Sequence, residues 1–105
     1  MMPGLTSSIA AAIVVALLVP AHAATIQITM TNLEISPADT SVKVGDTIEW
    51  INKDVFAHTA TATNGDFDVM LPPKKSATSV LKKAGTIDYY CRFHPNMKAT
   101  LKIEP

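Results

Sequence analysis

Residues 86–103 read TIDYYCRFHPNMKATLKI, and they contain two β-prone segments joined by a short loop. The first segment, 86–91, is rich in β-branched and aromatic residues, which favour strands. In the second segment, 97–103, apolar and polar residues alternate, as expected for a half-buried strand. Pro95 disfavours a helix between them, because proline restricts the residue before it and has no amide hydrogen. We therefore predict a strand, a tight connection and a second strand.

The composition excludes one class of partner. The chain has 105 residues with nine basic and nine acidic side chains, so its formal net charge is zero. A length in this range predicts a single domain. Proteins that bind nucleic acids through the phosphate backbone carry a basic surface, and a neutral chain does not provide one. We expect no nucleic-acid partner.

The N-terminal residues have the pattern of a secretory signal. Residues 9–19 form an unbroken apolar run of eleven, shorter than the roughly 20 residues that span a bilayer. The small residues of Ala21-His22-Ala23 are typical of a signal-peptidase site. We expect a signal peptide at residues 1–23, cleavage near Ala23, and a periplasmic domain of residues 24–105 without a membrane span. An uncleaved membrane anchor is the alternative, because no Lys or Arg precedes the apolar run.

The residues after Ala23 predict an all-β domain. Short alternating or β-branched segments recur between turn signals, and no segment has the period of an amphipathic helix. Seven or eight such strands predict a Greek-key β-sandwich or barrel. The candidate strands are residues 25–31 with an extended continuation to 35, 42–44, 47–52, 56–63, 67–71, 76–81, 86–91 and 97–103. The residues expected to face the core include Ile48, Trp50, Ala99, Leu101 and Ile103.

Other features of the chain have structural interpretations. Gly45-Asp46 is a hairpin signal between its flanking strands. Trp50 and Tyr89 are expected to be core residues. Lysine pairs at residues 74–75 and 82–83 flank strands. We interpret them as protection of sheet edges and as an aid to solubility, in preference to a docking patch for a partner.

The loop between the last two segments, together with the residue at each of its ends, carries three potential metal ligands. Cys91, His94 and Met97 follow one another at intervals of three residues. Cys91 is the only cysteine, so an internal disulfide is impossible and the thiol needs another explanation. His58 is the other histidine after Ala23, and it can reach the same end because loops cluster at the ends of a sandwich. Two imidazoles, a thiolate and a weak thioether form the ligand set of a blue-copper electron-transfer site.

Each of these residues also has a plainer interpretation. Cys91 alone would more often be a small buried hydrophobe, His58 an ordinary polar residue, and Met97 a filler of the core. Copper is favoured over zinc because it leads the affinity order of divalent metals. The set leaves no open position for a reacting water, and no third histidine after Ala23 is present to act as a base. We therefore expect that the protein is not an enzyme.

The longer pattern resembles the cupredoxin family of type 1 blue-copper proteins. The segments that carry the resemblance are VKVGDTIEW at 42–50, Asn52, His58-Thr59, GTIDYYC at 85–91 and HPNM at 94–97. Two residues separate Cys91 from His94, and two separate His94 from Met97, a spacing similar to that of amicyanins. The resemblance implies one copper ion, with His58, Cys91 and His94 as strong equatorial ligands and Met97 as a weak axial ligand.

The resemblance also implies a surface for redox partners. His94 would lie near the surface and serve as the electron port, surrounded by apolar residues. The candidates for this apolar ring are Phe56, Met70, Leu71, Pro72 and Pro95. Thr59 stands where many family members have an asparagine that ties the two ligand loops together. We therefore expect the hydrogen bonds behind the ligands to differ here, and such bonds tune a metal.

Two functions from different classes remain open. The first is a monomeric periplasmic one-electron carrier whose copper cycles between Cu(I) and Cu(II), and which docks transiently near His94 with a dehydrogenase, cytochrome or oxidase. The second is a copper-binding protein for storage or delivery. Delivery proteins tend to expose clusters of Met and His, whereas only Met30, Met70 and Met97 follow Ala23, so the carrier is favoured. A structural sandwich domain with an incidental zinc or thiol is a third interpretation.

Overall fold

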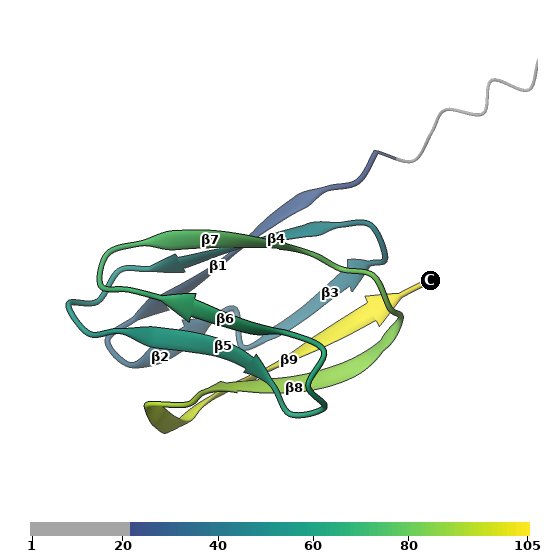
Figure 1. Ribbon diagram of the computed structural model, residues 1–105. Coiled ribbons are helices and arrows are strands. Elements are labelled where there is room, and N and C mark those ends of the chain that lie inside the picture. The colour runs from purple at the N-terminus through teal and green to yellow at the C-terminus, as the bar shows by residue number, and fades with distance from the viewer. Residues whose placement is uncertain (1–21) are drawn as a thin grey trace, which may run out of the picture.

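A computed structural model describes residues 22–105, which form two β-sheets and no helix (Figure 1). The signal peptide and the alternative membrane anchor expected at the N-terminus lie outside the described residues, apart from positions 22 and 23. Nothing in the range 22–105 forms a helix of the length and apolar character that a membrane crossing requires. The strands are β1 (Thr25–Thr31), β2 (Glu34–Ser36), β3 (Asp39–Lys43), β4 (Thr47–Asn52), β5 (His58–Ala62), β6 (Asp68–Leu71), β7 (Ser76–Val80), β8 (Gly85–Cys91) and β9 (His94–Glu104).

The two sheets pack as a sandwich. One has the strand order β2-β1-β4-β7, and the other has the order β3-β9-β8-β5-β6. The pairs β1–β4 and β3–β9 are parallel, and the remaining pairs are antiparallel. The predicted all-β sandwich is confirmed. Four connections, β1–β2, β4–β5, β6–β7 and β8–β9, lie together at one end of it (Figure 1).

Residues 22–105 contain nine strands where seven or eight were predicted. The extra strand arises because the chain does not continue extended from β1 to residue 35. Asn32 and Leu33 adopt left-handed φ angles of 53° and 62°, so β2 folds back antiparallel on β1. The carboxylate of Asp54 accepts hydrogen bonds from the backbone N–H groups of both residues, at 2.7 and 3.0 Å. A side chain distant in the sequence therefore stabilises a turn that local pattern does not reveal.

The hairpin predicted at Gly45-Asp46 is wrong. β3 pairs with β9, whereas β4 pairs with β1 and β7, so the turn carries the chain from one sheet to the other. Gly45 has a φ of 94°, a conformation that favours glycine. The Asp46 carboxylate accepts hydrogen bonds from Lys43 N and Ala24 N, both at 2.9 Å, and so ties this turn to the start of β1.

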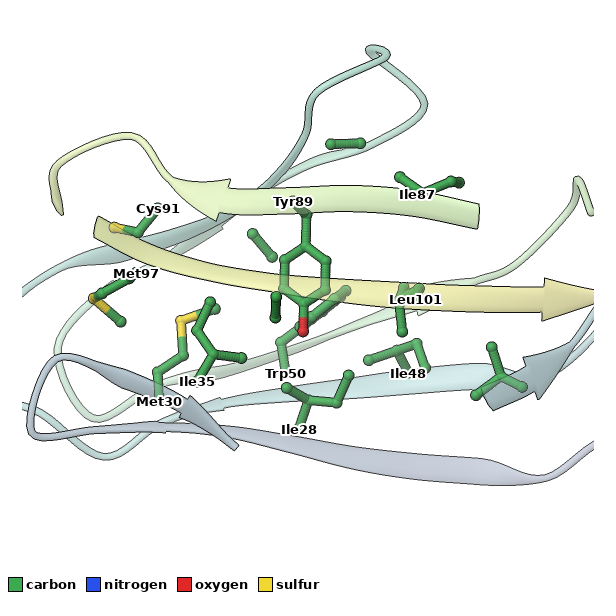
Figure 2. Close-up of a cluster of buried hydrophobic side chains, with 14 of the residues drawn as sticks. Ile28, Met30, Ile35, Ile48, Trp50, Ile87, Tyr89, Cys91, Met97 and Leu101 are labelled. Atoms are coloured by element: carbon green, nitrogen blue, oxygen red, sulfur yellow. The ribbon is translucent and has the colours of Figure 1, made fainter. Parts of the chain in front are cut away.

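The core lies between the sheets and is built around Trp50 and Tyr89 (Figure 2). Their ring centroids are 5.2 Å apart in an edge-on arrangement, and the Trp50 indole donates a hydrogen bond to the Ser79 hydroxyl at 3.0 Å. Both residues are buried, as predicted. The other predicted core positions are also buried: Ile48, Ala99, Leu101 and Ile103. Each large side chain buried in this way contributes about 1.5–3 kcal/mol.

The contribution of the Tyr89 hydroxyl to the stability of this core can be tested. It is buried and has no hydrogen-bond partner within residues 22–105, and burial raises the pKa of Tyr89 well above its usual value. Tyr89→Phe removes a desolvated polar group without removing a bond, so we expect the free energy of unfolding to rise by about 1 kcal/mol. Urea denaturation measures the difference. Tyr90→Phe, at a partly buried position, is the control and should change it by less than about 0.5 kcal/mol. A clear loss of stability in Tyr89→Phe would show that the hydroxyl is bonded to a buried water.

Candidate metal centre

The β8–β9 hairpin places Cys91 and His94 opposite each other. Cys91 is the last residue of β8, as predicted, but the ladder continues one pair beyond a register shift at Tyr90/Cys91. His94 is therefore the first residue of β9 rather than part of a free loop, and the connection is reduced to Arg92 and Phe93. His58, the first residue of β5, reaches the same end from the neighbouring strand.

Three donor atoms converge at this end of the sandwich. The Sγ atom of Cys91 lies 3.6 Å from Nδ1 of His58 and 3.7 Å from Nδ1 of His94. One ligand atom from each of the three residues lies within 4.8 Å of the others. His58 and Cys91 are fully buried, and His94 is partly buried. Met97 is buried, and Figure 2 shows it beside Cys91 at the end of the core.

These separations fit a metal ion better than direct hydrogen bonds. Bonds of about 2.3 Å to sulfur and about 2.0–2.1 Å to nitrogen, at an angle of about 110–120°, place the two atoms about 3.6–3.8 Å apart. The observed distances of 3.6 and 3.7 Å match this range. A thiol has one hydrogen, so it cannot donate to both imidazoles. The donor set of two imidazoles, a thiolate and a nearby thioether suits copper.

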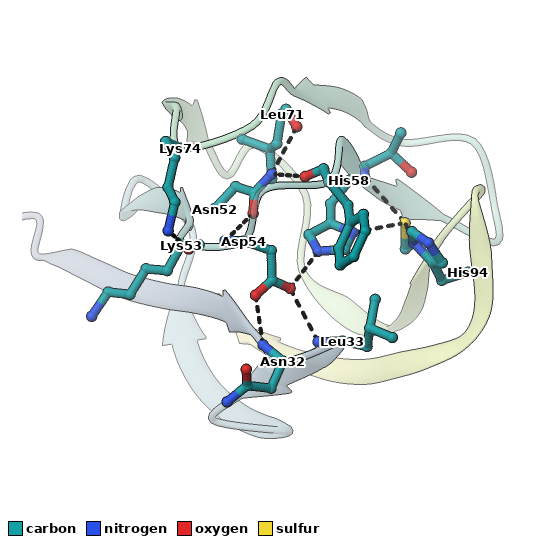
Figure 3. A network of polar contacts seen from close by, with 12 residues as sticks. Asn32, Leu33, Asn52, Lys53, Asp54, His58, Leu71, Lys74 and His94 are labelled. Carbon is teal, nitrogen blue, oxygen red and sulfur yellow. Dashed lines mark hydrogen bonds and ion pairs between the residues drawn. The ribbon is translucent and has the colours of Figure 1, made fainter.

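Asp54 fixes the orientation of His58 (Figure 3). Its Oδ2 atom lies 2.8 Å from Nε2 of His58, and this carboxylate is itself nearly buried. Because a carboxylate only accepts, Nε2 of His58 carries a hydrogen, and in the neutral imidazole Nδ1 then keeps a free lone pair directed at Cys91. Metal-binding histidines usually donate their second N–H to a carboxylate or carbonyl in this way.

The charge of Asp54 is stabilised by its bonds. Burial opposes ionisation, but the bonds from His58, Leu33 and Asn32 outweigh it and hold the pKa of Asp54 below its usual value. Asp54 was not predicted from the sequence. The signal was present, because a carboxylate four residues before a candidate ligand is a natural partner for its second nitrogen.

Asn52 holds the loop between β4 and β5 in place. The two hydrogens of its side-chain NH₂ are shared among three carbonyls, those of Phe56 at 2.7 Å, Leu71 at 3.1 Å and Pro72 at 3.2 Å, and its Oδ1 accepts from Asp54 N at 2.9 Å. Asn52 is almost fully buried, so these bonds replace those it would make to water. The loop that carries Asp54 towards His58 is therefore attached to both β4 and β6.

Thr59 connects the two parts of the centre. Its backbone N–H points at Cys91 Sγ, with 3.4 Å between the nitrogen and the sulfur. Its hydroxyl oxygen accepts a hydrogen bond from Arg92 N at 2.8 Å. The tie between the β5 and β8–β9 segments is thus present, although it is made by a threonine.

The surface around His94 is apolar. Phe56 and Met70 are about half exposed, and the Phe56 ring centroid lies 6.2 Å from that of His94. The prediction that Leu71 belongs to this surface is wrong, because alternation along β6 turns Met70 outward and Leu71 into the core. Further exposed apolar residues of this end are Pro72, Pro95, Val55, Phe93 and Leu33, of which Val55, Phe93 and Leu33 were not predicted.

Comparison with known proteins identifies the family to which this fold belongs. The family model described as a cupredoxin-like domain matches residues 5–103. The chain belongs to this family. A cupredoxin-like domain is what the resemblance implied, and the nine-stranded sandwich agrees with it.

The similar proteins include amicyanins. The chain is 32% identical to amicyanin of Paracoccus denitrificans over 69 residues, covering 60% of this chain and 53% of that protein, so it spans about half the length of this relative. It is 31% identical to the methylamine utilization protein MauL of Methylorubrum extorquens over 88 residues, covering 80% and 77% of the two chains.

Solved structures show the same likeness. A reduced amicyanin mutant superimposes with a TM-score of 0.66 and 28% identity, covering 76% of this chain and 82% of that one. Another amicyanin mutant, with a TM-score of 0.65, 27% identity and the same coverage of 76% and 82%, is described as a reduced Cu(I) form at pH 4.

Asp54 gives a sharp test of the centre. Asp54→Asn removes the negative charge opposite His58 Nε2–H and replaces one of the two acceptor oxygens with an NH₂ donor, so we expect a loss of about 10- to 100-fold in Cu(II) affinity. Competition with a chelator measures the Cu(II) affinity of each variant. Asp46→Asn is the matched control, because Asp46 is also a nearly buried carboxylate that accepts two backbone N–H groups, but it lies in the β3–β4 turn at the other end. Both variants should lose stability, and equal copper affinity in the two would contradict the assigned role of Asp54.

Proposed function

We propose that the protein is a one-electron carrier whose single copper ion is held by His58, Cys91, His94 and Met97. The observation that supports this most strongly is the convergence of Cys91 Sγ and two imidazole Nδ1 atoms at 3.6 and 3.7 Å. When bound, the copper ion would supply the Cu(II)/Cu(I) couple, since imidazole suits the oxidised ion and sulfur ligands favour the reduced one. With four protein ligands, the site offers no position for a reacting water, so we propose a carrier rather than an enzyme.

The surrounding residues are suited to holding one geometry in both oxidation states. Asp54 restrains His58, the Thr59 N–H restrains the sulfur of Cys91, and the β-ladder restrains His94. Preorganised polar groups of this kind need little rearrangement when charge changes at the site. Rapid electron exchange depends on that property.

We propose His94 as the place where electrons enter and leave. It is the partly buried member of the three, whereas His58 and Cys91 are enclosed. Phe56, Met70 and Phe93 provide exposed apolar area nearby, and exposed apolar patches mark sites of protein contact. We propose that a redox protein docks there transiently and that the carrier acts as a monomer.

Copper reconstitution tests the proposed function. We expect Cu(II) to give an intense blue colour that a reductant bleaches reversibly, because the thiolate and imidazoles form a type 1 ligand set. Cys91→Ser should abolish the colour, and Met97→Leu should keep it but change the reduction potential. Met30→Leu is the control, since Met30 is an equally buried methionine in β1. A colourless product, or irreversible loss of copper on reduction, would favour storage or delivery instead.

We also propose that the chain is exported and that cleavage after Ala23 leaves Ala24 as the first residue. Ala24 is held at both of its backbone groups: its N–H donates to Asp46 Oδ1 at 2.9 Å, and its carbonyl accepts from Thr47 N at 2.9 Å. His22 and Ala23 are exposed. The bonds from Ala24 and Lys43 lower the pKa of Asp46, so the carboxylate is charged and suited to receive a terminal ammonium.

This proposal predicts an interaction between the chain start and Asp46. Mass spectrometry of the exported protein should give Ala24 as its first residue. Asp46→Asn should then destabilise a chain starting at Ala24 more than one retaining His22-Ala23, since a terminal ammonium adds Coulombic attraction to a hydrogen bond that an amide N–H makes without it. Because the pKa of Asp46 is lowered by folding, this contribution is present above the unfolded pKa and is lost as pH falls through the folded value. Equal losses in the two chains at neutral pH would contradict the proposed ion pair.

A further inference from the structure

Arg92 lies in the two-residue connection between Cys91 and His94, and it is bonded to the β5–β6 hairpin at two points. Its backbone N–H donates to Thr59 Oγ1 at 2.8 Å, and its side-chain Nε donates to Asp68 Oδ1 at 3.1 Å. Thr59 is fully buried, whereas Arg92 and Asp68 are exposed by 41% and 55%. The contacts therefore run from the interior beside Cys91 to the surface.

A third residue joins these two contacts. Thr59 Oγ1 and Thr61 Oγ1 are 2.9 Å apart, and Thr61 Oγ1 donates to Asp68 Oδ1 at 2.7 Å. Thr59 and Thr61 are two residues apart in β5, so they lie on the same face of the strand. The four residues Arg92, Thr59, Thr61 and Asp68 thus form a closed ring of hydrogen bonds that begins and ends at Arg92.

The donors and acceptors around the ring have one consistent assignment. The Asp68 carboxylate only accepts, so the Thr61 hydroxyl hydrogen points to it. Thr61 Oγ1 must then accept from the Thr59 hydroxyl, and Thr59 Oγ1 is left to accept from Arg92 N. The bond from Thr61 and then the bond from Arg92 lower the pKa of Asp68, so the chain of hydroxyls ends on a charge. Chains of hydrogen bonds polarised in one direction strengthen one another.

We infer that this ring holds the Cys91–His94 connection in its ligand-binding position, and that Thr61 and Asp68 are positioning residues that act through Thr59. The same Thr59 directs its backbone N–H at Cys91 Sγ, so a shift of Thr59 changes both the connection and the environment of the sulfur. An exposed Arg–Asp pair alone contributes little. Its role here is to close a ring whose central member is buried. The effect on copper rests on the proposed function, but the ring itself belongs to the protein without metal.

The alternative is that these residues are ordinary surface polar groups of a β-hairpin. Thr61 and Asp68 are cross-strand partners in the β5–β6 ladder, and such pairs are common in sheets. On that view Thr61→Val, which keeps the shape and β propensity of the side chain, would leave Arg92 and the centre unchanged. On our view it leaves the Thr59 hydroxyl without its acceptor and weakens the bond to Arg92 N.

The test compares Thr61→Val with Thr61→Ser, which keeps the hydroxyl, and with Thr100→Val as the matched control. Thr100 Oγ1 makes the same kind of bond, to Asp88 Oδ1 at 2.8 Å, but its pair lies further along the β8–β9 ladder from the connection. The first readout is hydrogen exchange of the Arg92 amide in the metal-free protein, with the Trp50 amide as a reference for global stability. The second readout is the rate of copper release from the loaded protein.

We expect Thr61→Val to accelerate exchange at Arg92 by about five- to tenfold relative to Trp50, the effect of losing about one hydrogen bond. It should also accelerate copper release, whereas Thr61→Ser and Thr100→Val should match the wild type in both readouts. Asp68→Asn, which removes the charge but keeps an acceptor, should have a smaller effect of the same sign. Unchanged exchange at Arg92 in Thr61→Val would overturn the ring even if copper binds reversibly. If exchange at Arg92 is faster in Thr61→Val but the wild-type protein does not bind copper, the ring is supported and the proposed function is overturned.

Discussion

The pairing of Cys91 with His94 at the end of the β8–β9 ladder is the constraint on which the rest of the centre depends. It puts a thiol and an imidazole side by side through backbone geometry, and it reduces the connection between them to two residues. His58 comes from the adjacent strand, so all three donors are carried by neighbouring strands of a single sheet. A site built on strands is positioned more accurately than one built on free loops. The sheet therefore brings the donors to within 4.8 Å of one another.

Such a cluster needs polar partners, because buried imidazole and thiol groups cost free energy when they are left unpaired. The chain supplies them with residues that serve two elements each. Asp54 orients His58 and also makes the left-handed Asn32–Leu33 turn possible. Thr59 contributes an N–H to the sulfur and a hydroxyl oxygen to Arg92. The other end of the sandwich uses the same principle, since Asp46 joins the β3–β4 turn to the start of β1. Loss of one such side chain disturbs two segments at once.

The sequence predicted the all-β sandwich, the inward positions of β4 and β9 and the four candidate ligands, because alternation and residue spacing are local properties. It did not predict β2, the sheet change at Gly45-Asp46, or the burial of Leu71. Gly45 predicts a turn. Which sheet β4 joins after that turn is decided by its pairing with strands that are distant in the sequence. Asp54, Thr61 and Asp68 were missed for a related reason: a carboxylate or hydroxyl acquires its role from the strand beside it, and that neighbour is not visible in the order of residues.

The central claim is that the protein alone holds the donor atoms where a copper ion needs them. Crystal structures of the metal-free and copper-loaded protein at neutral pH test it most directly. Our account predicts that Cys91 Sγ and the Nδ1 atoms of His58 and His94 move by less than about 0.5 Å between the two, the tolerance expected of a preorganised site. A metal-free structure in which His94 has turned away from Cys91, or in which the sulfur has closed onto one imidazole, would contradict it.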